Sequence, residues 1–124
     1  MPRRPRVLVA DDHPALMTAV CRLLELDSEV VGSVTDGKLL LEAAEQLQPD
    51  VIVLDVNLPK ISGLDACRQL TQAHPGMKII VFTAMTDPAI REQSFAAGAS
   101  AFVSKLAGAG ELLSTITRLC DDLA

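Results

Sequence analysis

Five short apolar runs recur along the chain, and they constrain its fold more than any other feature. The runs are rich in β-branched residues and are apolar throughout, with no alternation of apolar and polar positions. Such runs are typical of strands that are covered on both faces, as in a parallel sheet. The expected strands cover residues 6–10, 29–34, 51–54, 78–82 and 101–103.

Segments with the period of an amphipathic helix follow each run. In the first of these segments Leu16, Val20 and Leu23 fall on one face, and the other four lie within residues 40–47, 64–73, 90–97 and 112–123. Residues suited to helix starts stand before or within the segments: Pro14, Gly37, Gly63 and Pro88. Strands that alternate with helices predict a single α/β domain, a three-layer sandwich whose five-stranded parallel sheet has the order 2-1-3-4-5.

The charge of the chain excludes one class of function. The net charge is −5, but three of the eleven basic residues are Arg3, Arg4 and Arg6, so that eight basic residues face 16 acidic ones from residue 7 onward. A surface this acidic repels phosphate backbones, and we therefore expect no direct binding of nucleic acid by this domain. Residues 1–5 are interpreted as a basic arm with a solvated terminus, and residues 6–124 as the folded domain.

Cysteine usage and hydropathy indicate the cellular compartment. Cys21, Cys67 and Cys120 are odd in number, have no CxxC spacing and occupy helix-like apolar positions, which favours buried thiols in a reducing environment. No apolar run approaches the ~18 residues of a membrane span, and no signal peptide opens the chain. We expect a soluble, cytoplasmic protein without membrane association.

Polar residues follow four of the five expected strands. Asp11 and Asp12 follow the first strand, Asp55 the third, Thr83 the fourth and Lys105 the fifth. In the order 2-1-3-4-5 the carboxyl ends of strands one and three flank the topological switch point, where ligands bind. Three carboxylates crowded there need a cation, and an all-oxygen set suits Mg²⁺. A divalent ion, a lysine and a hydroxyl that face one carboxylate are what an incoming phosphoryl group requires.

These motifs together resemble the response-regulator receiver domain of two-component signalling. The stretches "ADDHP" after the first strand, "DVNLPKISG" at 55–63, "TA" at 83–84 and "AFVSK" at 101–105 occur in the family's order, and the resemblance covers about residues 5–123. It implies the flavodoxin/CheY-like (βα)5 fold and is nearest to the NarL/FixJ subfamily, whose members usually carry a LuxR-type helix-turn-helix. Many receivers have proline where Leu106 stands, and because a cis bond before leucine would cost ~3 kcal/mol we expect a trans bond there.

The resemblance also implies a role for each site residue. Asp55 would be the phosphoacceptor, which attacks a phosphohistidine on a partner sensor histidine kinase. Asp12 and Asp55 would coordinate Mg²⁺ (or Mn²⁺) directly. Asp11 would act largely through water, and Asn57 through its backbone carbonyl. Lys105 would pair with Asp55 and then with the phosphoryl oxygens.

Further positions correspond to the family's conformational switch. Thr83 would move to bond the phosphoryl group, and Phe102 would turn from solvent toward the space that Thr83 leaves. Ala84 and Met85 are candidates to modulate the reaction. We expect the bulky Met85 to impede the hydrolytic water and to prolong the phosphorylated lifetime.

Simpler interpretations exist for several of these residues: a helix cap for Asp12, a strand-end hydroxyl for Thr83, a solvated surface amine for Lys105 and core packing for Phe102. The two histidines are expected to have no chemical role. His13 is interpreted as shaping the start of the first helix, and His74 as a surface-loop residue.

Other functions stay open beside the phosphorylated switch, which would catalyse its own phosphorylation and dephosphorylation without being a turnover enzyme. One is a docking receiver that is not phosphorylated. Another is an aspartyl-phosphate hydrolase, although hydrolases of the haloacid-dehalogenase type need DxD after the first strand and a cap segment. The expected output is transcription through a C-terminal helix-turn-helix domain absent from this chain. We also expect a homodimer through helices one and five, or through helix four, strand five and helix five.

Overall fold

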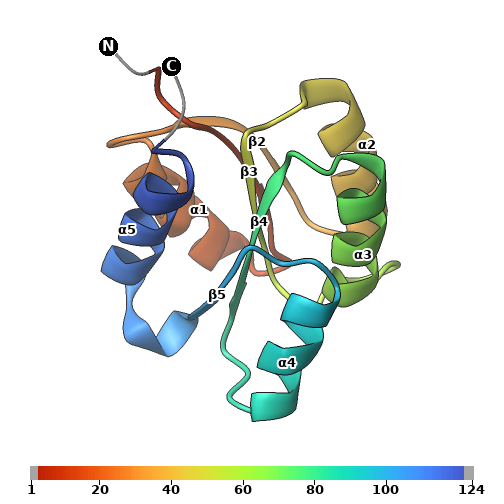
Figure 1. The fold of residues 1–124 in the computed structure, drawn as a ribbon. Helices are drawn as coiled ribbons and strands as arrows, with labels where there is room; N and C mark the ends of the chain where they lie inside the picture. Colours follow the sequence, from red (N-terminus) through yellow and green to blue (C-terminus); the bar gives the residue numbers. More distant parts are fainter. Residues whose placement is uncertain (1–2, 122–124) are drawn as a thin grey trace.

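The computed structural model describes residues 3–121 and contains a five-stranded parallel sheet between two layers of helices (Figure 1). The strands pair in the order β2-β1-β3-β4-β5. Their bounds are β1 (Arg6–Ala10), β2 (Glu29–Val34), β3 (Val51–Leu54), β4 (Lys78–Thr83) and β5 (Ala101–Ser104). The predicted α/β fold and strand order are confirmed, and β4 and β5 each extend one residue past the expected end.

The helices connect the strands near the expected positions. Their bounds are α1 (Pro14–Leu24), α2 (Gly37–Leu47), α3 (Gly63–Ala73), α4 (Pro88–Ala96), the 3₁₀-helix η1 (Lys105–Ala107) and α5 (Ala109–Leu119). The side chains of Asp36, Ser62 and Asp87 each accept a backbone N–H in the first turn of α2, α3 and α4. The prediction of a last helix through residue 123 is wrong, because α5 ends at Leu119, and Leu123 lies outside the described residues. Within residues 3–121, no helix is long and apolar enough to cross a membrane.

Both faces of β1, β3 and β4 are buried, which explains why these strands are almost wholly apolar, whereas β2 at the edge of the sheet is half-buried or exposed. Along β1, Leu8 and Ala10 pack with α2 and α3, whereas Val7 and Val9 pack with α1 and α5. Figure 1 shows α2, α3 and α4 over one face and α1 and α5 over the other. Alternate side chains of a strand point to opposite faces, so each position meets a helix layer. The two cores fix the sheet, and with it the edge at which the strands end.

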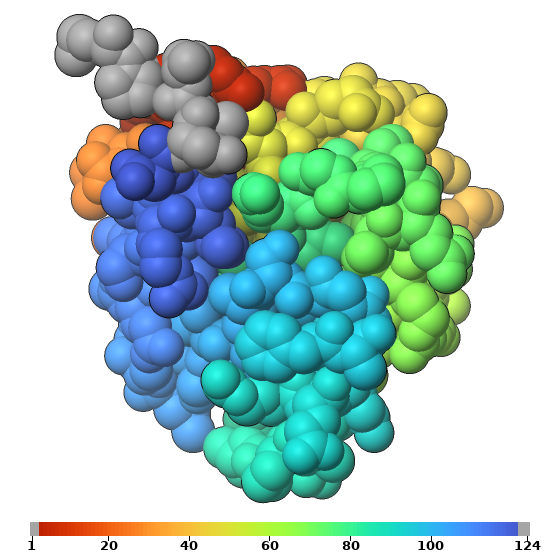
Figure 2. Space-filling view, in the orientation of Figure 1, coloured from red at the N-terminus to blue at the C-terminus, as the bar shows by residue number. Residues whose placement is uncertain are grey.

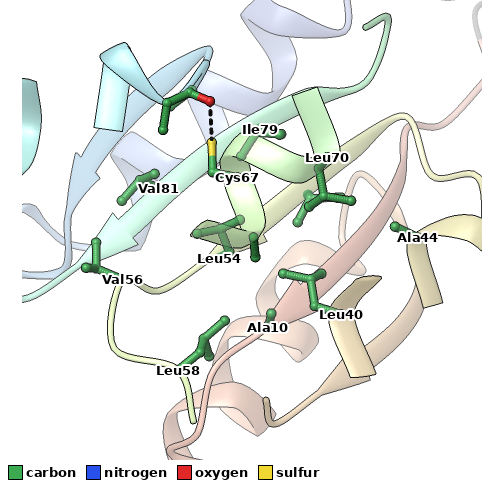
Figure 3. Packing of buried hydrophobic residues seen from close by; sticks show 14 of the residues in the cluster. Ala10, Leu40, Ala44, Leu54, Val56, Leu58, Cys67, Leu70, Ile79 and Val81 are labelled. Atoms are coloured by element: carbon green, nitrogen blue, oxygen red, sulfur yellow. Dashed lines mark hydrogen bonds between the residues drawn. The ribbon is translucent and has the colours of Figure 1, made fainter. Parts of the chain in front are cut away.

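The cysteines lie among core residues, with one exception. Cys67 and Cys120 are buried as predicted, but Cys21 is only half-buried. The Cys67 thiol points from α3 toward the chain after α4, where it donates to the Ala97 carbonyl at 3.6 Å (Figure 3). It therefore belongs to the packing between α3 and α4, away from the polar edge of the sheet.

The beginning of the described chain lies against the body of the protein. The Arg3 guanidinium donates two hydrogen bonds to the Asp50 carboxylate, at 2.6 and 2.7 Å. These bonds hold the pKa of Asp50 below its ordinary value, although partial burial opposes the shift. Arg4 donates to the backbone carbonyls of Glu25 and Ser28. Arg3 and Arg4 nevertheless stay exposed to solvent, and the boundary between arm and domain stays a prediction.

Candidate functional site

The pairing of β1 with β3 places two carboxylates side by side. Ala10 pairs with Leu54 in parallel register, so that Asp11 and Asp55 follow neighbouring strands at the same edge. The Asp55 N–H donates to the Ala10 carbonyl at 3.1 Å, which extends the ladder beyond the strand. Only 5% of Asp11 and 4% of Asp55 is exposed. Buried carboxylates are costly unless they are paired, so their partner is the main question of the site.

That partner is Lys105, which follows β5. In the sheet, β5 lies two strands from β3 and three strands from β1. Its Nζ lies 2.7 Å from Oδ2 of Asp11 and 2.6 Å from Oδ2 of Asp55. The side chain passes near β4, where its ammonium stands 5.9 Å from the centroid of the Phe82 ring, and only 11% of it is exposed. The structure thus excludes a solvated surface lysine at this position. One ammonium bridges the two buried carboxylates.

The bridge outweighs the effect of burial on both charge types. Burial raises the pKa of Asp11, but the hydrogen bonds from Lys105 and His13 together lower this pKa by a larger amount. The net shift is therefore downward. Burial lowers the pKa of Lys105, yet its hydrogen bonds to Asp11 and Asp55 give a net upward shift. The ammonium and the carboxylate of Asp11 are therefore both charged at neutral pH.

His13 joins the site, and Asp12 stands outside its buried part. The Nδ1 atom of His13 lies 2.9 Å from Oδ1 of Asp11 and 3.1 Å from Oδ1 of Asp12. Ligand atoms of Asp11, His13 and Asp55 all fall within 4.8 Å of one another. Within residues 3–121, these three side chains form the group that could hold a metal ion. The Asp12 side chain is 37% exposed. It does not cap α1, whose N-cap residue is His13.

Sequence reasoning therefore missed His13 as a member of the site. The residue was expected only to shape the start of α1, which it does as N-cap residue. Its place directly after the two aspartates was the available signal, because a residue that follows a strand end stays near that end. The direction of its ring is fixed by contacts that the sequence does not reveal.

The loop after β3 depends on a close approach of two backbone segments. A Cβ atom on Gly63 would stand 2.1 Å from the Asp55 carbonyl oxygen, which is possible for no side chain. The Gly63 N–H donates to the Val56 carbonyl at 2.8 Å, and the Asn57 N–H donates to Oδ1 of Asp55 at 3.2 Å. This loop therefore folds back under Asp55 and places the Asn57 backbone beside the carboxylate.

Thr83 ends β4 within the same edge of the sheet. It is buried, with 1% exposed, and its Oγ1 accepts the backbone N–H of Met85 at 3.3 Å. Met85 is half-buried against the core on the α2, α3 and α4 side, whereas Ala84 is exposed. The hydroxyl is thus held by its own loop and has no bond to Asp55 or Lys105 among those of the described chain.

Phe102 lies half-buried on β5, and it contacts the core without being enclosed by it. The Arg91 guanidinium stands 5.8 Å from the centroid of the Phe102 ring and 5.3 Å from that of Phe95, both within the range of cation–π contacts. Figure 2 shows α4 and β5 forming the surface between α3 and α5. A pocket of about 320 Å³ opens there, lined by Met85, Thr86, Asp87, Pro88, Arg91, Phe102 and Ser104.

Two smaller expectations concern residues near these segments. The peptide bond before Leu106 is trans, as predicted, and the unpredicted helix η1 begins at Lys105. His74 follows α3 as expected, but only 16% of its side chain is exposed because it packs beside Glu45 on α2, with 3.2 Å between Nε2 and Oε2. It lines a pocket with Met77 and Lys78 at the amino ends of the strands, away from the acidic edge.

The donor set of the edge fits a divalent cation. Two buried carboxylates share the single ammonium of Lys105, so one negative charge is left to be balanced in a poorly solvated place. Carboxylate oxygens suit Mg²⁺ and Mn²⁺, and an imidazole nitrogen suits transition ions. The residues able to hold an ion are Asp11, His13 and Asp55.

Comparison with known proteins agrees with this geometry. The family "Response regulator receiver domain" matches residues 7–117. The response regulator GacA of Pseudomonas viridiflava is 37% identical over 113 residues, which cover 90% of this chain and 53% of GacA. The chain thus spans about half the length of the curated relatives it matches.

Solved structures share the whole fold. The signal receiver domain of the putative response regulator NarL from Mycobacterium tuberculosis has a TM-score of 0.91 and 29% identity, covering 98% of this chain and 99% of that one. The isolated REC domain of RcsB from Salmonella enterica serovar Typhimurium, solved in the presence of phosphomimetic BeF3⁻, has a TM-score of 0.89 and 25% identity, covering 98% and 91%. The resemblance seen in the motifs is confirmed, and the chain belongs to the response regulator receiver domain family.

Proposed function

We propose that this domain accepts a phosphoryl group on Asp55 from a sensor histidine kinase, with Mg²⁺ or Mn²⁺, and acts as the switch of a two-component system. The observation that carries the proposal is the bridge from Lys105 to both Asp11 and Asp55. This bridge holds the buried carboxylate of Asp55 beside the positive charge of Lys105. Negative charge on the phosphoryl oxygens would develop at this place during phosphoryl transfer. The solved RcsB domain with a phosphomimetic supports the same chemistry.

Asp55 is the nucleophile in this reaction. One of its oxygens attacks phosphorus, an O–P bond forms, and the P–N bond to the kinase histidine breaks, with the electron pair returning to the imidazole. Oδ2 of Asp55 is held by Lys105 at 2.6 Å, whereas Oδ1 accepts the longer bond from the Asn57 N–H at 3.2 Å. We therefore assign the attack to Oδ1, and Lys105 offsets the charge on the phosphoryl oxygens.

The sequence resemblance assigned the direct ligation of Mg²⁺ or Mn²⁺ to Asp12 and Asp55 and a water-mediated part to Asp11. Because Asp11 is buried beside Asp55 and Asp12 is 37% exposed, we propose instead that the carboxylates of Asp11 and Asp55 would hold the ion, with Asp12 and the Asn57 carbonyl as further ligands. When bound, such an ion reduces the repulsion between the acidic edge and the incoming phosphoryl oxygens. The chain's own part is to hold Asp11 and Asp55 in register and to keep Lys105 against them.

Thr83 and Phe102 carry the response in this proposal. Thr83 gives up the bond from the Met85 N–H and donates its hydroxyl to the phosphoryl group, which draws the loop after β4 toward Asp55. Phe102 then turns from its place beside Arg91 toward the core. The surface of α4, β5 and α5 changes as a result, and a homodimer forms through that surface or through α1 and α5.

The output is proposed to be transcription through a DNA-binding helix-turn-helix domain beyond this chain. Two observations support this: the motifs resemble the NarL/FixJ subfamily, and the chain spans about half of its curated relatives. The receiver itself does not contact DNA in this proposal, because acidic residues outnumber basic ones over the domain.

The test is phosphorylation with a small donor. After incubation with acetyl phosphate and Mg²⁺, the intact mass of the chain is expected to rise by one phosphoryl group, and the adduct is expected to be stable in acid and labile in base. Asp55→Asn abolishes the adduct, and a chelator does the same. Asp65→Asn, which removes an exposed carboxylate on α3, serves as matched control and retains the adduct.

Three results would contradict the proposal. An unmodified mass under all conditions would favour a docking receiver that is not phosphorylated. Continued release of phosphate from many phosphoesters would favour an aspartyl-phosphate hydrolase. An adduct that persists in Asp55→Asn would place the acceptor at another residue.

Met85 is proposed to protect the phosphorylated state. Its half-buried side chain stands just past Thr83, where it would exclude water from the aspartyl phosphate. Met85→Ala is expected to shorten the lifetime of the adduct several-fold, measured as loss of the phosphorylated mass after removal of acetyl phosphate. Met77→Ala, which truncates a half-buried methionine at the opposite edge of the sheet, is the control. Equal lifetimes in Met85→Ala and the unchanged chain would refute this role.

A further inference from the structure

His13 has contacts that its role as the N-cap residue of α1 does not explain. Its side chain makes no capping hydrogen bond, and 63% of it is exposed. Its Nδ1 instead lies 2.9 Å from Oδ1 of Asp11 and 3.1 Å from Oδ1 of Asp12. One Nδ1–H group cannot donate fully to two carboxylates, and Oδ1 of Asp11 already accepts the His13 backbone N–H at 2.9 Å.

The spacing of these atoms matches that of ligands on one small ion. Two ligands at right angles on an ion about 2.1 Å from each would be about 3.0 Å apart, and two opposite ligands about 4.2 Å apart. The distances from Nδ1 to the two carboxylate oxygens, 2.9 and 3.1 Å, fit the first value. The ligand atoms of Asp11, His13 and Asp55 lie within 4.8 Å of one another, so small side-chain movements would bring all three within reach of one ion.

The backbone holds this imidazole at the site. His13 has φ −102° and ψ 98°, and Pro14 restricts the preceding residue to such extended values. The residue is therefore held in an extended conformation beside the end of β1, and 63% of its side chain is exposed. A neutral ring with its proton on Nε2 presents the Nδ1 lone pair to an ion held by Asp11.

We propose that His13 is a nitrogen ligand of the metal site and that it shifts the preference of the site from Mg²⁺ toward divalent transition ions. This inference rests on the proposed function in one respect: it concerns the metal ion that the proposed function places beside Asp11 and Asp55. Mg²⁺ gains little from imidazole, Mn²⁺ binds it weakly, and Ni²⁺ binds it well. The ion that accompanies Asp11 and Asp55 is then selected by the one ligand that is not oxygen.

The direct test is the spectrum of bound Mn²⁺. Electron spin-echo modulation from a coordinated nitrogen is expected with the unchanged 124-residue chain and Mn²⁺ alone. His13→Asn keeps an amide donor near the position of Nδ1 but loses the ligand, so the modulation disappears; His13→Phe gives the same loss. His74→Ala, which removes the second of the chain's two histidines, retains the modulation.

Affinities give an independent measure. By calorimetry, His13→Asn is expected to weaken Ni²⁺ binding by about 10-fold or more and Mg²⁺ binding by less than about 3-fold. A site in which His13 merely positions Asp11 through a hydrogen bond would show equal losses for both ions, or none. Either that result, or a Mn²⁺ spectrum without nitrogen modulation, overturns the proposal.

Phosphorylation of the unchanged chain separates this proposal from the proposed function. A chain that forms the Asp55 adduct with acetyl phosphate and Mg²⁺ but shows no nitrogen signal refutes the ligand role of His13 alone. A chain that shows the signal but forms no adduct refutes phosphoryl acceptance and leaves the ligand role in place.

Discussion

Lys105→Met is expected to lower the free energy of unfolding by about 3–5 kcal/mol, the range for removal of one partner from a buried ion pair. The substitution keeps much of the side-chain volume but leaves Asp11 and Asp55 buried without their common cation. Urea unfolding followed by far-ultraviolet circular dichroism measures the change, because the chain has no tryptophan. Lys38→Met removes an exposed lysine on α2 and is expected to change stability little.

The pH dependence of the free energy of unfolding provides a second measurement. A loss of side-chain packing alone would not change this dependence. The pKa of Asp11 lies below its ordinary value of 3.8, so its ionised form stabilises the native chain above that pH, and this contribution is lost as the pH falls. Without Lys105 the pKa of Asp11 is expected to be higher than in the unchanged chain, because burial is then opposed only by the hydrogen bonds from His13. The gap in stability between the unchanged chain and Lys105→Met is therefore expected to narrow as the pH falls below 3.8. A constant gap would show that charge is not the cause.

Gly63→Ala is expected to cost about 3 kcal/mol, the upper end of the usual range for overpacking. The added Cβ would stand 2.1 Å from the Asp55 carbonyl oxygen and 2.7 Å from Cα of Val56, and backbone atoms cannot rotate away as a flexible side chain can. The loop after β3 must shift to relieve the clash. The shift moves the backbone of Asp55 itself, so the variant is also expected to form its phosphoryl adduct more slowly.

Gly110→Ala is the matched control for this change. Gly110 is the second residue of α5, and a Cβ there would meet nothing within 4 Å. The same substitution is therefore expected to be neutral or to add about 0.5–1 kcal/mol, because alanine restricts the unfolded chain. If Gly63→Ala and Gly110→Ala unfolded at the same urea concentration and accepted phosphate at the same rate, the close approach at Asp55 would have no energetic role.

The sequence allowed the fold and the main charges of the site to be predicted for a simple reason. Continuous apolar runs require a sheet with two covered faces, and parallel strands bring the residues after their ends to one edge. That topology brings Asp11, Asp55 and Lys105 to one edge, where their side chains meet. The order of the strands was the only assumption that the prediction needed.

The sequence did not predict features that depend on particular turns or on contacts between residues far apart in the chain. The ring of His13 faces the two aspartates because of the turn between β1 and α1, and periodicity carries no information about such a turn. The ion pair of Arg3 was not predicted, because its partner, Asp50, is 47 positions away. The last helix was drawn too long because its apolar period continues past Leu119, where the hydrogen-bonded helix ends.

The bridge at Lys105 also has a consequence for the newly made protein. Lys105 lies 94 positions after Asp11 and 50 after Asp55, directly after β5, which is synthesised after the other four strands. A partly synthesised chain, or one truncated before β5, contains both aspartates but not the amine that would stabilise a phosphorylated product. If Asp55 accepts a phosphoryl group as proposed, the complete site is therefore assembled only when β5 docks.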